Sequence, residues 1–109
     1  MSNNTDVVVV ATLIPRAGKE AALEEALRAA VRGAHQEHGC RRYALHRTIR
    51  GGEGLVVIEH WDSADALAAH GKGEPFTSLA AQFEDLLAEP LRATVLASLP
   101  EGDPTLGRL

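Results

Sequence analysis

The stretch LVVIEHWDSADALAAH, residues Leu55 to His70, is the strongest indication of the fold, because it predicts a strand that passes directly into a helix. Its first half, LVVIEHW (Leu55–Trp61), is rich in the β-branched and aromatic residues that strands favour. Asp62 or Ser63 can then cap a short helix formed by SADALAAH. The segment therefore predicts a junction between a sheet and a layer of helices. A glutamate, the only tryptophan and two of the histidines lie at this junction.

The rest of the chain predicts three more strands and two more helical segments around this junction. The expected strands are 6–14, 40–49 and 91–99, and the expected helices are 17–39 and a segment that begins at Pro75 and stops at Pro90. A glycine-rich hairpin turn, Arg50–Gly54, joins two strands, and Gly71 and Gly73 end the short helix. The order β-α-β-β-α-α-β is the ferredoxin-like pattern, an α+β fold with helices on one face of a four-stranded antiparallel sheet.

Both faces of the expected sheet are apolar. In the first strand, for example, Val7 and Val9 alternate with Val8 and Val10. An antiparallel sheet with one face in water should alternate more clearly between apolar and polar residues. An uncovered face would expose several hundred Å² of apolar surface, which is large for a monomer. We therefore expect a homodimer in which two sheets pack face to face, forming a dimeric α+β barrel.

The composition is that of one small domain. We place this domain at residues 6–99, between a disordered N-terminus (1–5) and a flexible tail or dimer arm (100–109). The net charge of −4 argues against a nucleic-acid partner. The single cysteine, Cys40, excludes an intrachain disulfide. The apolar run 7–11 is too short for a signal sequence or a membrane span, so we expect a cytoplasmic protein with no membrane partner.

Several residues form a pattern that resembles the antibiotic biosynthesis monooxygenase (ABM) family. The pattern is a Gly-Cys-x-x-Tyr start to the second strand, a strand ending in Glu-x-Trp, and a capped helix with a histidine. The matching residues are Gly39, Cys40, Tyr43, Glu59, Trp61 and His70. The resemblance covers roughly residues 6–99. It implies a dimeric α+β barrel and, for some members, oxidation of a phenol or quinol by O2 with no metal, haem or flavin cofactor.

The chain departs from this family's pattern in two places. Many members carry a second histidine five residues after the helix histidine, where this chain has Pro75 before Phe76. The haem-degrading branch uses an asparagine, a tryptophan and a late histidine. Alignment puts Ala11 at the asparagine position and about Ala80 at the histidine position. Only Trp61 matches, so the resemblance argues against haem degradation.

His70 and Trp61 are the candidate catalytic residues. A neutral imidazole at the end of the short helix can accept a phenol proton near neutral pH, which makes His70 the candidate base. The alternative for His70 is a histidine that interacts with the C-terminus of its helix. The indole of Trp61 offers a planar substrate a stacking surface and one N–H donor. The alternative for Trp61 is a place in the core or the dimer interface.

Four residues are candidates for binding a small aromatic substrate. Tyr43 can donate a hydrogen bond to a substrate oxygen, or it can simply bury its ring. Phe76, Leu79 and Phe83 share one helix face and can wall a cavity between the helices and the sheet. The same spacing is also typical of core residues.

Three further residues are structural or secondary candidates. Glu59 lies among apolar neighbours, where a carboxylate is costly unless paired. We expect a salt bridge from Arg42, Arg47 or a partner chain, with a catalytic base as the minority interpretation. His46 and His60 lie on paired strands and could be neighbours across the sheet. Because no third well-spaced ligand accompanies them, we predict no metal site.

Three functions compete on these observations. The first is a cofactor-independent monooxygenase that uses His70 as base and oxidises a small phenol or quinol. The second is an isomerase of a small phosphorylated or keto compound, which would need Arg42 and Arg47 to point into the pocket. The third is a non-catalytic binding or stress-response dimer with a filled pocket. The orientation of the arginines and the presence of a cavity distinguish the three functions.

Overall fold

The computed structural model describes residues 5–109, so nearly all of the expected disordered N-terminus (1–5) lies outside the described residues. The strands are β1 (Val7–Leu13), β2 (Cys40–Arg47), β3 (Leu55–Trp61) and β4 (Arg92–Ala97). The helices are α1 (Glu20–Ala34), α2 (Ala64–Lys72), α3 (Glu74–Ala80) and the short α4 (Phe83–Leu86). This order confirms the expected β-α-β-β-α-α-β pattern. No helix in residues 5–109 is long and apolar enough to cross a membrane.

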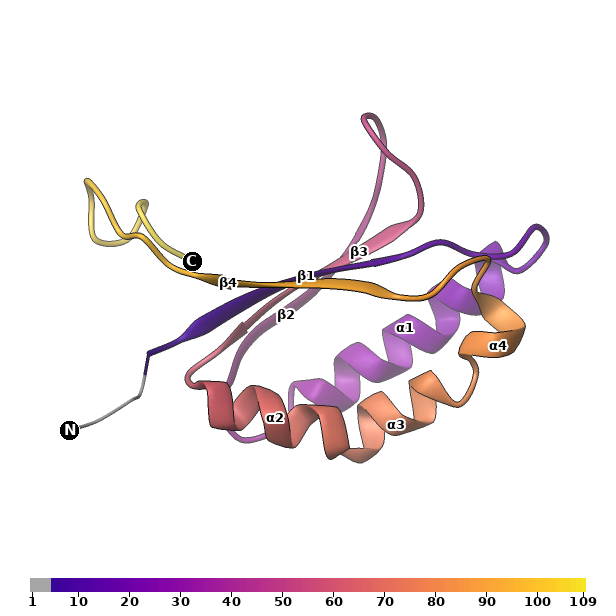
Figure 1. The fold of residues 1–109 in the computed structure, drawn as a ribbon, viewed down its shortest axis with the longest axis horizontal. Coiled ribbons are helices and arrows are strands. Elements are labelled where there is room, and N and C mark those ends of the chain that lie inside the picture. The colour runs from indigo at the N-terminus through magenta and orange to yellow at the C-terminus, as the bar shows by residue number, and fades with distance from the viewer. Residues whose placement is uncertain (1–4) are drawn as a thin grey trace.

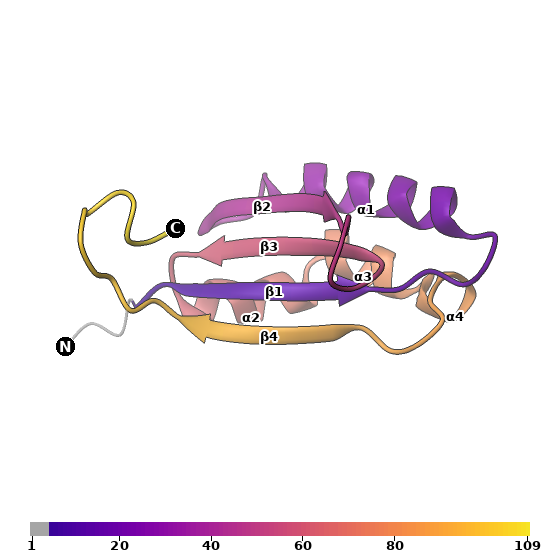
Figure 2. The same cartoon turned by 90° about the horizontal axis from the view of Figure 1, so that it is seen from above.

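The four strands form one antiparallel sheet in the order β2-β3-β1-β4 (Figure 2). All the helices lie on the same side of this sheet (Figure 1). The chain therefore has the ferredoxin-like α+β fold. β4 is an edge strand that pairs only with β1 among the described strands, and every one of its residues is exposed.

The core lies between the helices and the inward face of the sheet. α1 contributes a buried stripe at the expected helical spacing, and the inward residues of β1 and β3 pack above it. The members of this core that are less than a tenth exposed include Leu23, Leu27, Ala30, Ala34, Val9, Ala11, Leu13, Val57 and Trp61. The expected alternation along β1 and β3 is therefore confirmed for the inward face.

Helix boundaries depart from the sequence-based expectation at three points. α1 is shorter than 17–39, and Gly39 sits in a later turn with φ +83° instead of ending the helix. α2 continues through Gly71 and ends at the extended Gly73. The last helical segment is interrupted between α3 and α4, and the chain becomes extended at Leu87, which forms a bridge with Pro15 at the end of β1. Contacts with the sheet thus end this segment before Pro90.

Within residues 5–109, no helix lies over the outward face of the sheet (Figure 1). Its central residues Val10, Val56 and Ile58 are half-buried, and Leu96 on β4 is 42% exposed. Two segments rise on this side of the sheet in Figure 1, the β2–β3 hairpin and the C-terminal tail. Each exposes apolar side chains, which are Ile49 in the hairpin and Leu99 and Leu106 in the tail.

One end of the outward face carries a polar cluster formed by the buried Asp6 and His60 and the exposed Arg108. His60 Nε2 lies 2.6 Å from Asp6 Oδ2, and Arg108 Nη2 donates to the same oxygen at 2.9 Å. These hydrogen bonds lower the pKa of Asp6 to about 2. The tail is therefore attached to the sheet near its end. His60 pairs with Arg42 and His46 with Val56, so the two histidines are not cross-strand neighbours.

Candidate functional site

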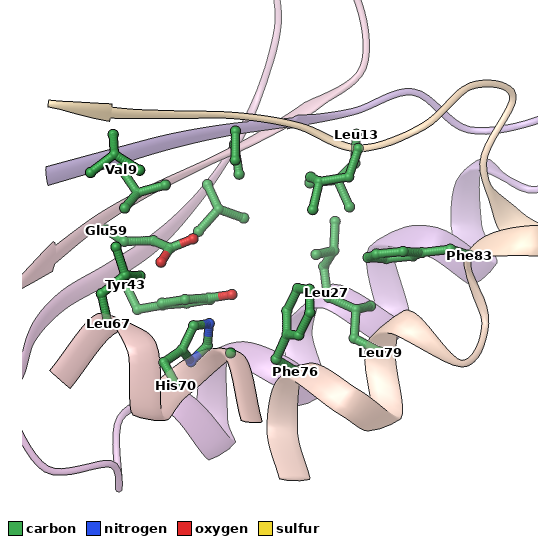
Figure 3. Close-up of a pocket in the computed structure, with 16 residues that line it drawn as sticks. Val9, Leu13, Leu27, Tyr43, Glu59, Leu67, His70, Phe76, Leu79 and Phe83 are labelled. Atoms are coloured by element: carbon green, nitrogen blue, oxygen red, sulfur yellow. The ribbon is translucent and has the colours of Figure 1, made fainter. Parts of the chain in front are cut away.

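A cavity of about 180 Å³ lies between the sheet and the helices (Figure 3). Its walls are almost entirely aliphatic and aromatic, with contributions from all four strands and from α1, α2, α3 and α4. The lining residues are Val9, Ala11, Leu13, Leu27, Tyr43, Val57, Glu59, Leu67, His70, Gly71, Phe76, Leu79, Phe83, Leu91, Ala93 and Val95. The space is open, because Val95 lines it and is also 56% exposed on the edge strand. The mouth therefore lies at β4.

Three polar side chains gather at one end of this cavity. Tyr43 and Glu59 are partners across β2 and β3 and point to the same face of the sheet, and His70 approaches them from the last turn of α2 (Figure 3). Neither the Tyr43 hydroxyl nor His70 Nε2 has a hydrogen-bond partner among residues 5–109, and neither is sealed from solvent. Both atoms are therefore available to a molecule in the cavity.

His70 is held on all sides by aromatic rings and by one carboxylate. Its ring centroid lies 4.6 Å from that of Trp61, 5.4 Å from that of Tyr43 and 5.7 Å from that of Phe76. Its Nδ1 lies 2.7 Å from Glu37 Oε1. Glu37 lies in the segment between α1 and β2 and was not among the sequence-based candidates. A buried, oriented histidine with one nitrogen free fits the general base expected from the sequence.

Trp61 lies behind the polar end of the cavity and does not line it. Its side chain is fully buried, which matches the core alternative. Its indole N–H donates to Glu59 Oε1 at 2.9 Å, and its ring packs against that of His70 at a tilt of 34°. Trp61 therefore positions two residues that do line the cavity, and its position does not allow direct stacking on a molecule there.

Glu59 forms no salt bridge among residues 5–109, so the expected pairing with Arg42 or Arg47 within the chain is wrong. Arg42 is opposite His60 on the outward side of the sheet, and Arg47 pairs with Glu24 on α1. Burial is the main cause that raises the pKa of Glu59, although the Trp61 N–H and the nearby His70 partly oppose the shift. The neutral carboxyl form that burial favours can donate a hydrogen bond into the cavity.

Two other groups near the polar end also have raised pKa values. Burial, aided by the charges of Glu59 and Glu37, raises the pKa of Tyr43. Burial likewise raises the pKa of the Cys40 thiol, and the charges of Glu37 and Glu59 raise this pKa further. Tyr43 therefore acts as a hydrogen-bond donor at neutral pH, and Cys40 does not become a thiolate nucleophile.

The apolar end of the cavity is formed by the helix face predicted from the sequence. Phe76 and Leu79 come from α3, and Phe83 comes from α4 (Figure 3). The rings of Phe76 and Phe83 meet edge to face, with centroids 6.1 Å apart. This geometry is favourable for aromatic pairs and leaves flat apolar surface toward the cavity.

The remaining two candidates, His46 and His60, lie outside the cavity. His46 is exposed on β2, and His60 is buried in the polar cluster on the outward face. Within residues 5–109, no group of three or more histidine, cysteine, aspartate or glutamate side chains is arranged to hold a metal ion.

The chain is thus a small α+β protein with an apolar cavity between the helices and the sheet and a histidine at one end of that cavity. The profile of the antibiotic biosynthesis monooxygenase family matches residues 6–82, which is most of the domain. The chain belongs to this family.

Individual relatives cover almost the whole chain. The curated protein "Putative monooxygenase Rv0793" of Mycobacterium tuberculosis is 38% identical over 95 residues, which are 87% of this chain and 93% of the relative. The solved structure of Rv0793 gives a TM-score of 0.83 at 36% identity over 91% of this chain and all of that chain. PA3566 from Pseudomonas aeruginosa gives 0.81 at 30% identity, over 91% of this chain and 99% of its own. These similarities extend the match from the family profile to β4.

Proposed function

We propose that this protein is a monooxygenase that uses O2 to oxidise a small phenol or quinol. The observation that carries the proposal is an open apolar cavity with three polar groups at one end. A phenol can place its ring among Phe76, Leu79 and Phe83 and its oxygen beside His70. The family membership and the monooxygenase name of a relative that is 38% identical support the same reaction class.

The polar end can perform the first step of this chemistry. His70 Nε2 accepts the substrate O–H proton, and the electron pair of the broken bond stays on oxygen as a phenolate. The Tyr43 hydroxyl can donate a hydrogen bond to this anion in a dry site, and the carboxyl group of Glu59 can do so in its protonated form. The phenolate then reduces O2. One oxygen atom replaces a ring C–H as a carbonyl, the other leaves as water, and the substrate becomes a quinone. The substrate supplies all the electrons, so we propose that no metal, haem or flavin takes part.

The size and charge of the cavity limit the substrate. An apolar cavity of roughly 150 Å³ can hold benzene, so about 180 Å³ suits a single ring or a compact bicyclic compound. No arginine or lysine is among the lining residues. The cavity therefore favours uncharged substrates. The phosphorylated substrates of the isomerase alternative are disfavoured, because Arg42 and Arg47 do not reach the cavity.

Oxygen uptake tests the proposal. The chelator-treated protein is mixed with uncharged phenols and quinols of one and two rings and, as a contrast, with their phosphate esters. We expect one O2 consumed per quinone formed with the uncharged compounds, and no accumulation of hydrogen peroxide. A panel without uptake, or uptake that yields only peroxide, would show that the protein is not a monooxygenase of this class.

We also propose that two copies pair through the outward faces of their sheets, with the hairpin and the tail reaching over the partner. The support is the apolar centre of the outward face, formed by Val10, Val56 and Ile58, which no helix of residues 5–109 covers. Sedimentation should give twice the mass of one 11.6 kDa chain. A charge placed at the centre of this face, as in Ile58→Glu, should give the monomer, whereas Ser78→Glu on exposed α3 should not. A wild-type mass near that of one chain would contradict the pairing.

A further inference from the structure

His70 has a carboxylate partner on the side away from the cavity. Nδ1 of His70 and Oε1 of Glu37 are 2.7 Å apart, and the two side chains are 6% and 18% exposed. A carboxylate in its ordinary ionised form can only accept, so the imidazole proton must lie on Nδ1. The hydrogen bond at one ring nitrogen determines the state of the other. Nε2 is then left without a proton, and it is the nitrogen that faces the cavity.

The chain makes room for this carboxylate at one specific place. A methyl group added at Gly73 would overlap Glu37 Oε2, so the glycine between α2 and α3 is what admits the side chain. Gly39, with φ +83°, turns the chain two residues after Glu37, and a methyl group there would collide with Asp62 and Ala66 at the start of α2. Gly39 thus lets the segment of Glu37 pack against the start of α2, and Gly73 leaves the space that the Glu37 carboxylate occupies.

His70 also lies between the cavity and a hollow on the protein surface. Glu37 and His70 both line this hollow, together with His38 and Asp65. Glu37 therefore keeps contact with water while His70 stays buried. The titratable groups that face His70 from the packed elements are Glu37, Tyr43 on β2 and Glu59 on β3. Burial raises the pKa of both Tyr43 and Glu59, whereas Glu37 lies against the ring at the surface hollow.

We propose that Glu37 is the positioning residue of the site: it holds His70 with Nε2 free toward the cavity and stabilises the imidazolium formed when Nε2 takes the substrate proton. In that step the substrate O–H bond breaks, the Nε2–H bond forms, and the Nδ1 proton stays in place. The charge on the imidazolium is matched by Glu37 on one side and by the phenolate on the other. The catalytic consequence of this inference rests on the proposed function. The orientation of His70 does not depend on the proposed function.

The test of the orientation uses nitrogen NMR of the histidine side chains in the free protein. With five histidines in the chain, His70 is assigned by comparison with His70→Asn. At a pH at which the imidazole is neutral, the ring proton of His70 in the wild type should be on Nδ1. In Glu37→Gln the signal should move toward a mixture of both tautomers, because an amide can donate as well as accept. A wild-type proton on Nε2, or the same tautomer in both proteins, would overturn the inference whether or not the protein consumes oxygen.

The catalytic consequence is tested with the substrate that gives oxygen uptake. Glu37→Gln should lower kcat by about 100-fold with little change in KM, within the range that a general base contributes. The acid limb of its pH profile should move to lower pH, because the ionised partner of the imidazolium is gone. Glu37→Asp should recover part of the activity, and Gly73→Ala, which displaces the carboxylate, should resemble Glu37→Gln.

The matched control is Glu25→Gln, which removes an exposed carboxylate of α1 and should behave as the wild type. If Glu37→Gln keeps wild-type kcat and pH profile while the wild type oxidises phenols, the inference is wrong and the proposed function stands. If the wild type oxidises none of the phenols, and the tautomer of His70 still depends on Glu37, the proposed function is wrong and the inferred orientation of His70 is correct.

Discussion

Replacement of His70 by asparagine should lower kcat/KM for phenol oxidation by about 10²- to 10⁴-fold, the range that a positioned general base contributes. Asparagine can still donate a hydrogen bond to Glu37 and fills part of the same space, but it cannot take up a proton. The side chain of His70 is buried among three aromatic rings. In the variant, only a water molecule in the cavity could take the place of the imidazole as proton acceptor. Binding of the substrate ring should change little, because it depends on the apolar end of the cavity.

The measurement is oxygen uptake and quinone formation at several substrate concentrations, with circular dichroism to show that the variant is folded. His46→Asn is the matched control, since His46 is exposed on β2 and lies outside the cavity. The control should keep wild-type rates. A His70→Asn protein that is folded and within a few-fold of wild type would remove His70 from the mechanism.

Replacement of Trp61 by alanine should lower the free energy of unfolding by about 3–5 kcal/mol, as for other large-to-small changes at fully buried aromatics. The side chain is 0% exposed and packs against Tyr43 and His70. Its removal leaves a void next to the cavity and takes away the N–H that Glu59 Oε1 accepts. An unpaired buried acceptor adds to the loss.

Urea unfolding followed by circular dichroism measures this change. Trp61→Phe is the informative comparison, because it keeps most of the ring volume and removes the N–H, so the loss should be only about 1–2 kcal/mol. Combining Trp61→Phe with Glu59→Gln in a double-mutant cycle should reveal coupling between the two positions. A loss below about 1 kcal/mol for Trp61→Ala would show that the ring is not part of the core.

The strands and the first helix were predictable because their signals are local. The bounds expected for β3 agree with the structure, since a β-branched run between a glycine turn and a capped helix leaves few alternatives. Ser63 caps α2 as expected and accepts from the N–H of Ala66. The division of the last helical segment into α3 and α4 was not predictable. It depends on Leu87 joining Pro15 and on Ala88 bonding to Ile14, contacts between parts of the chain far apart in sequence.

In the candidate site, too, the sequence predicted some residues correctly and did not predict the contacts between distant segments. The helical spacing identified Phe76, Leu79 and Phe83, and the alternation of β3 placed Glu59 and Trp61 on one face. The pairing of Glu59 with Arg42 or Arg47 within the chain was predicted incorrectly, because Arg42 lies on the outward side of the sheet and Arg47 pairs with Glu24. Glu37 carried no signal, since it sits in a turn and meets His70 across 33 residues of sequence.

The strands, the order of the elements and the family could be read from the sequence alone, because periodicity, caps and turns act over a few residues. Which polar groups meet depends on how the distant segments pack. This packing set Glu59, Tyr43 and His70 around one cavity, put Trp61 behind them, and brought Glu37 to the far side of the imidazole. Hydrogen bonds between distant segments depend on the register of the strands, on where the helices end and on where glycines allow segments to approach closely. These features form only when the helices pack on the sheet.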